Sequence, residues 1–150
     1  YTSPLTKDQY SQALKITNFG FNLPAEAKVE GIEVIVIRKA DVEGSIQDKR
    51  VTLLRGNAPY GISLHTQDTW DAEWTAAYYG EAQEDWDAVW KVADVNASGF
   101  GIAIEVQSVG AIARPQIDEV LVTIHYSYGG ESARWYRSAT QRNTCVGTGG

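Results

Sequence analysis

Three stretches of the chain carry an apolar side chain at every second position, and this pattern most constrains the fold. They are residues 29–39, 100–106 and 116–126. Successive side chains of an extended strand point to opposite faces, so each stretch predicts a β-strand with at least one buried face. We expect the inward-facing side chains to share one core. They are Ile32, Val34, Val36, Phe100, Ile102, Ile104, Val120, Val122 and Ile124.

Further strands are predicted beside these three. The first stretch also carries Ile35 and Ile37 on its other face, which predicts a central strand covered on both sides. Residues 11–19, 49–55 and 61–65 have the composition of shorter strands.

Residues 69–90 are harder to assign, because some of their Trp and Tyr residues recur at a helical spacing. Gly80 interrupts that spacing and the neighbouring segments are strands, so short strands and turns are favoured. Residues 92–99 predict a loop with one helical turn. Seven or eight short strands without a long helix indicate an all-β fold, an antiparallel β-sandwich or barrel.

Composition limits the classes of function. The 150 residues suit a single domain with one core. A net charge of −6 argues against nucleic acid as a partner, and no apolar run is long enough to span a membrane. One cysteine, Cys145, cannot form an internal disulfide. The chain begins with Tyr1 rather than Met, which favours a processed chain or a piece of a longer protein.

Five segments occur in a recognisable order between residues 11 and 127. They read "LKITNFGFNLPAEAKVEGIEVIVIRKA", "IQDKRVTLLRG", "YYGEAQEDWDAVW", "DVNASGFGIAIEV" and "PQIDEVLVTIHYS". This order resembles a β-sandwich domain of jelly-roll type that recurs in phage virion and tail-associated proteins and in large bacterial surface proteins. Gly80-Glu81 and Trp86-Asp87 depart from the Gly-Gly and Trp-Gly of that pattern. The resemblance implies about eight antiparallel strands and a structural or adhesive role, and it transfers no catalytic residue.

The regular spacing of apolar residues ends after Tyr128. Residues 1–128 are predicted to form the sandwich, and residues 129–150 a tail hinged at two glycines. This tail is expected to be a linker or an added strand that contacts copies of the same chain or neighbouring structural subunits. The candidate interface residues are Arg134, Trp135, Tyr136 and Arg137.

The aromatic residues of segment 70–90 suggest an alternative function. Flat rings stack on sugars, and the acidic residues among them would accept hydrogen bonds from hydroxyl groups, so a carbohydrate-binding module is the second hypothesis. The same rings serve equally well in a core or in a protein interface. The candidate glycan-binding residues are Trp70, Trp74, Tyr78, Tyr79 and Trp86.

Other polar residues give little sign of chemistry. Asp41, Glu43 and Asp48 are oxygen ligands that Ca²⁺ would accept, but they lack a calcium-loop spacing and are expected to form a solvated turn. His65 and His125 are too few for a zinc site, and His125 is expected on the surface of a strand.

No nucleophile elbow, phosphate loop or paired His–acid motif occurs, so we expect no enzyme activity, no cofactor and no metal. Asn96 begins an Asn-Ala-Ser glycosylation sequon. The sequence thus favours a non-enzymatic structural module of an extracellular fibre, filament or virion. Its partners would be its own copies or neighbouring subunits, with glycans as the alternative and neither nucleic acid nor membrane involved.

Overall fold

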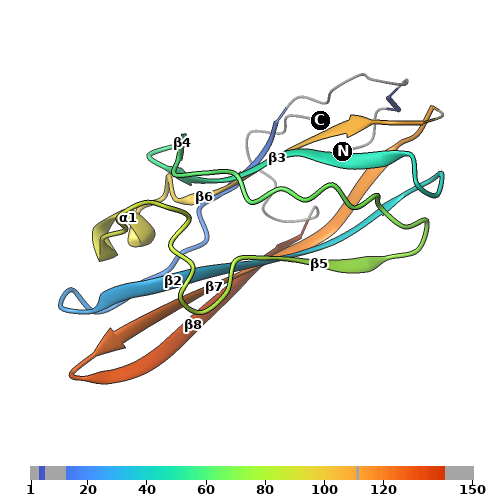
Figure 1. Ribbon diagram of the computed structural model, residues 1–150. Helices are drawn as coiled ribbons and strands as arrows, with labels where there is room; N and C mark the ends of the chain where they lie inside the picture. Colours follow the sequence, from blue (N-terminus) through green and yellow to red (C-terminus); the bar gives the residue numbers. More distant parts are fainter. Residues whose placement is uncertain (1–3, 6–12, 111, 141–150) are drawn as a thin grey trace.

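Two four-stranded sheets stacked in layers form the protein (Figure 1). The computed structural model describes residues 4–5, 13–110 and 112–140. The first sheet has the order β1 (Leu14–Thr17), β6 (Gly101–Ser108), β3 (Ile46–Arg55) and β4 (Ala58–Tyr60). The second has the order β5 (Thr75–Tyr79), β2 (Lys28–Ala40), β7 (Pro115–Tyr128) and β8 (Glu131–Thr140).

Neighbouring strands in both sheets run antiparallel. The predicted all-β antiparallel sandwich with about eight strands is therefore confirmed. The jelly-roll connectivity that the resemblance implies stays a prediction.

The core lies between the two sheets. All nine side chains predicted to share it are at most 1% exposed and belong to one apolar cluster. Val51 and Leu53 of β3 belong to the same cluster. Apolar residues at every second position in three distant segments thus identified the interior correctly, because only one face of each strand meets the opposite sheet.

The outer face of β2 differs from expectation. β2 is an interior strand, between β5 and β7, as predicted. However, Ile35 and Ile37 on its outer face are only partly buried, so the expected cover on both sides is wrong.

Residues 61–65 do not form the predicted strand. The chain reverses instead at Gly56 and Asn57, both with positive φ, and β4 pairs with the end of β3 at once. Gly61, at φ +89°, then ends the pairing. In the segment 69–90 the structure has only β5 and turns, which confirms short extended elements over a helix. The helix α1 (Val92–Asn96) supplies the helical turn expected in the following loop.

Strand β8 corrects the predicted domain boundary. Tyr128 and Glu131 pair across a two-residue loop, in which Gly129 and Gly130 have φ values of +60° and +81°. Two positive φ values are what a type I′ hairpin turn requires. The prediction that the chain leaves the sandwich after Gly130 is therefore wrong for residues 131–140, because the glycines form a tight turn instead of a hinge. Residues 141–150 lie outside the described part of the chain.

Candidate functional site

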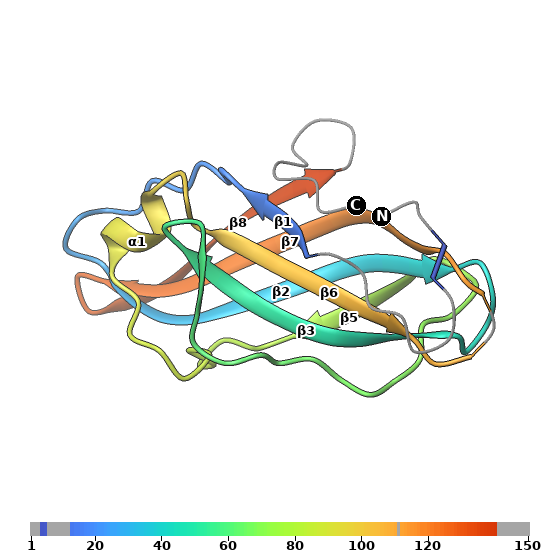
Figure 2. The same cartoon turned by 90° about the horizontal axis from the view of Figure 1, so that it is seen from above.

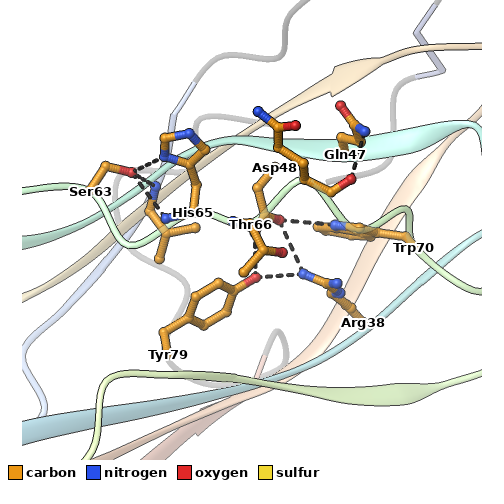
Figure 3. A network of polar contacts seen from close by, with 10 residues as sticks. Arg38, Gln47, Asp48, Ser63, His65, Thr66, Trp70 and Tyr79 are labelled. Carbon is orange, nitrogen blue, oxygen red and sulfur yellow. Dashed lines mark hydrogen bonds and ion pairs between the residues drawn. The ribbon is translucent and has the colours of Figure 1, made fainter.

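A buried polar cluster joins the two sheets (Figure 3). Arg38 of β2 places Nη1 3.1 Å from Oδ1 of Asp48 in β3. Tyr79 of β5 donates its hydroxyl to Oδ2 of Asp48 at 2.7 Å, and Nε1 of Trp70 donates to Oδ1 at 3.0 Å. The Arg38 guanidinium also lies over the Trp70 ring, 4.8 Å from its centroid.

Both oxygens of Asp48 have two partners each. The backbone N–H of Thr66 adds a further hydrogen bond to Asp48, at 3.2 Å. Burial, followed by the negative charge of Asp48, raises the pKa of the Tyr79 hydroxyl well above its ordinary value. A saturated carboxylate and a phenol held in its protonated form offer no group for reaction with a substrate. The cluster therefore serves to connect the sheets.

The three loop acids do not converge. Asp41 accepts a hydrogen bond from the N–H of Arg114 at 2.6 Å, and Glu43 accepts one from the N–H of Ala72 at 2.9 Å. Asp48 is buried, so the prediction of a solvated turn is wrong for this residue. Among the described residues, no three His, Cys, Asp or Glu side chains are grouped to hold a metal ion.

The two histidines have separate local partners. Nδ1 of His65 lies 2.7 Å from Oγ of Ser63, which also accepts a hydrogen bond from the N–H of Val51. This serine therefore supports the loop beside β3. His125 lies on the outer face of β7, where its Nε2 is 3.2 Å from Oε1 of Glu33 in β2.

The five-residue carbohydrate platform is wrong as a unit, because three of its rings are core side chains. Trp70, Tyr79 and Trp86 are at most 3% exposed. Trp74 and Tyr78 are 48% and 64% exposed and remain accessible.

The face of the Trp74 ring already has a partner. Nζ of Lys39 lies 4.8 Å from the ring centroid. A sugar would have to displace this cation, which weakens the case for stacking on Trp74.

The sequon asparagine also has an internal role. Oδ1 of Asn96 accepts from the N–H of Leu23 at 2.9 Å, and its Nδ2 donates to the Leu23 carbonyl at 3.1 Å. Asn96 thus attaches α1 to the connection between β1 and β2. The nitrogen that would carry a glycan is engaged in this contact.

The four predicted interface residues divide between the two faces of β8. Trp135 is partly buried, with its ring edge-to-face against Phe21 at 6.4 Å between centroids. Arg137 donates to the carbonyl of Gly20 at 3.1 Å. These two hold β8 on its own sandwich. Arg134 and Tyr136 are exposed, and the alternation of the strand directs them to the outer face.

The backbone of β8 offers a second set of groups. Among the described residues, β8 is the last strand of its sheet, at the margin of the molecule (Figure 2). In a two-residue hairpin the residues that flank the loop form a hydrogen-bonded pair, and bonded and non-bonded pairs then alternate. The odd-numbered residues of β8 therefore bond to β7. The residues that direct N–H and C=O toward the open edge are Ser132, Arg134, Tyr136 and Ser138.

This edge is long and regular. β8 has ten residues, whereas β5, at the other edge of the same sheet, has five. The ladder between β7 and β8 has no register shift and β8 contains no proline, whereas the β2–β7 and β3–β6 ladders both contain shifts. Natural proteins usually shorten, bend or block such an edge, because its free groups can pair with another chain. The open edge of β8 is the candidate functional site.

The sequence contains a signal for this site. Gly129-Gly130 between two strand-like stretches is typical of a hairpin turn, although the few large apolar residues after it favour a linker.

No helix in the described ranges has the length and apolar character needed to cross a membrane. Comparison with protein-family models, curated protein sequences and solved structures gives no significant match. The β-sandwich fold therefore rests on the structure, and a link to phage or bacterial surface proteins rests on the resemblance of the sequence segments alone.

Proposed function

We propose that this protein is a non-enzymatic structural module that joins neighbouring subunits of an extracellular fibre, filament or virion through the open edge of β8. The observation that carries the proposal is the ten-residue edge without a register shift or a proline. Main-chain groups along such an edge supply affinity to any extended segment that pairs with it.

Two further observations support a structural role. The most elaborate polar cluster, around Asp48, is saturated by its own chain and connects the two sheets. The order of the strand segments also resembles domains of virion and surface proteins, which implies a structural or adhesive role.

Proline on the open edge provides the test. Ser132 and Ser138 direct their N–H groups away from β7, so a Ser132→Pro/Ser138→Pro variant removes two edge donors while the ladder to β7 stays intact. The matched control is Ser132→Ala/Ser138→Ala, which keeps both N–H groups. Sedimentation velocity and electron microscopy at high protein concentration report assembly, and circular dichroism reports folding.

We expect the proline variant to fold and to lose assembly, and the alanine variant to assemble like the parent protein. Equal assembly of a folded proline variant and its alanine control would refute a role for this edge.

A further inference from the structure

The two edges of the second sheet are suited to each other. β5 and β8 lie on opposite sides of the molecule in Figure 2, at the ends of the order β5-β2-β7-β8. We propose that β8 of one copy pairs with β5 of the next copy, so that the second sheet continues from subunit to subunit. This inference rests on the proposed function and names its partner: a second copy of this chain, bound head to tail.

Strand direction permits this pairing by simple repetition. The sheet has four strands and every neighbouring pair is antiparallel, so β5 and β8 run in opposite directions. When two copies stand side by side in the same orientation, β5 of one and β8 of the next are therefore antiparallel. An odd number of strands would have placed parallel edges together.

The backbone groups of β5 are oriented for this contact. The N–H of Ala40 donates to the carbonyl of Asp71, and the N–H of Ile32 donates to the carbonyl of Glu84, each at 2.9 Å. Both acceptors flank β5, so the even-numbered residues of β2 direct their backbone groups toward β5.

The register then shows which residues of β5 direct their backbone N–H and C=O groups away from β2. Val34 and Val36 pair with Tyr79 and Ala77, and these two pairs carry the hydrogen bonds. Ala76 and Tyr78 therefore direct N–H and C=O outward, and their side chains lie on the outer face, as Tyr136 does on β8. The residues that would form hydrogen bonds across the junction have their side chains on the outer face in both strands. The outer and inner faces of the sheet would therefore each continue from one copy to the next.

Charge favours a junction between unlike edges. Residues 71–87, which include β5, contain six acidic residues and no Lys or Arg. β8 contributes Arg134 and Arg137 against a single acid, Glu131. If β8 paired with another β8, the arginines of both copies would lie close together. If β5 paired with another β5, the acidic residues of both copies would lie close together. The β5–β8 junction brings opposite charges together, and like-charge apposition is what suppresses wrong partners.

Two exposed tyrosines indicate the register. Tyr78 is 64% exposed on β5 and Tyr136 is 63% exposed on β8, and both belong to the outward-directed set. Aromatic side chains directly opposite each other stabilise an antiparallel pair. Placing Tyr136 opposite Tyr78 of the next copy also sets Arg134 opposite Gly80, beside Glu81. In this register residues 75–79 pair with residues 135–139.

Two copies joined through β5 and β8 still leave one β8 edge and one β5 edge unpaired. A contact between two different surfaces repeats until a rotation closes it into a ring, and otherwise it produces an open filament. The right-handed twist of β-strands rotates each copy relative to the last, so the expected assembly is a helical filament with a continuous sheet.

Disulfide trapping between separate variants tests the partner and the register. Tyr78→Cys and Tyr136→Cys proteins are prepared separately, each with Cys145→Ser, and are oxidised alone and as an equal mixture. Ala76→Cys and Ser138→Cys form a second pair in the same register and keep both tyrosines. Non-reducing electrophoresis and peptide mass spectrometry identify the linked residues. We expect a disulfide-linked dimer in each mixture and its loss when either variant is oxidised alone.

The other outcomes separate this inference from the proposed function. Dimers of Tyr136→Cys or Ser138→Cys alone would show β8 pairing with β8, which overturns the head-to-tail junction and leaves the edge as a connector. Absence of all cross-links, with proline and alanine variants that assemble alike, would overturn both.

Discussion

Arg38 of β2 and Asp48 of β3 lie 3.1 Å apart, Nη1 to Oδ1, in the interior between the two sheets. Their side chains are 8% and 0% exposed, so neither charge is compensated by water. Removing one partner of such a pair leaves a buried, unpaired charge, which costs far more than the pair itself contributes.

Asp48→Asn is therefore expected to lower the free energy of unfolding by about 3–5 kcal/mol. Trp70 and Tyr79 donate to different oxygens of Asp48, and an amide keeps only one acceptor oxygen, so the loss reports the uncompensated Arg38 together with one lost acceptor. Arg38→Met in the same protein should recover part of the loss. Guanidinium denaturation followed by fluorescence measures all three proteins. Asp118→Asn, at an exposed position of β7, is the control, and a comparable loss there would contradict the explanation.

The Tyr79 hydroxyl should make stability depend on alkaline pH. Its folded-state pKa is raised, chiefly by burial, above the value of about 10 in the unfolded chain. The folded state keeps its proton where the unfolded state loses it, so this contribution is complete below about pH 10 and is lost as the pH rises further. Tyr79→Phe should flatten the decline of unfolding free energy above pH 10. Tyr136→Phe controls for the loss of one phenol, and parallel slopes in all three proteins would argue against this linkage.

Ile104→Ala tests the shared core. Ile104 is 1% exposed in β6, opposite Leu14 and Val51, and its truncation should cost about 2–5 kcal/mol of stability. Val89→Ala, at 72% exposure, removes an aliphatic side chain from the surface. Thermal and urea unfolding of both variants should separate them clearly. Equal stability would place Ile104 outside the well-packed interior.

The turn between β7 and β8 tolerates only certain residues. Gly129→Asn should be nearly neutral, because Asn accepts positive φ and is favoured in type I′ turns. Gly129→Val should cost about 1–2 kcal/mol, because a β-branched residue is strained at φ +60°. A Cβ at this position would meet no heavy atom within 4 Å other than those of residues 128–130, so the difference would report backbone strain. Calorimetry of the two variants measures it, and equal melting temperatures would exclude a type I′ turn.

Alternation made the strands of the core predictable, but it indicated only one member of the polar cluster. Arg38 continues the even-numbered series of Ile32, Val34 and Val36, so its inward position was visible in the sequence. Its partner was not, because residues 40–48 have the composition of a loop. β3 begins already at Ile46, and Asp48 is thereby an inward-facing strand residue.

The position of β8 depends on contacts that local patterns do not contain. Its inward residues Trp135, Arg137 and Ala139 are too mixed in polarity to indicate a buried face. Trp135 packs on Phe21, more than a hundred residues earlier in the chain, and Arg137 bonds to the neighbouring Gly20. An edge strand at the margin of a sandwich needs less apolar surface than a central strand, so its pattern is weaker.

The interleaved strand order determines when the domain can fold during synthesis. β2 ends at Ala40, yet β7, its neighbour along most of its length, begins only at Pro115. β1 likewise pairs with β6, which is synthesised much later and begins at Gly101. A ribosome that has made the first hundred residues has therefore released β1 and β2 without these partners. Such long-range pairing is slow and leaves apolar strands exposed in the meantime. We expect folding to begin only after β7 emerges, and a chaperone that binds extended apolar segments to improve the yield of the nascent chain.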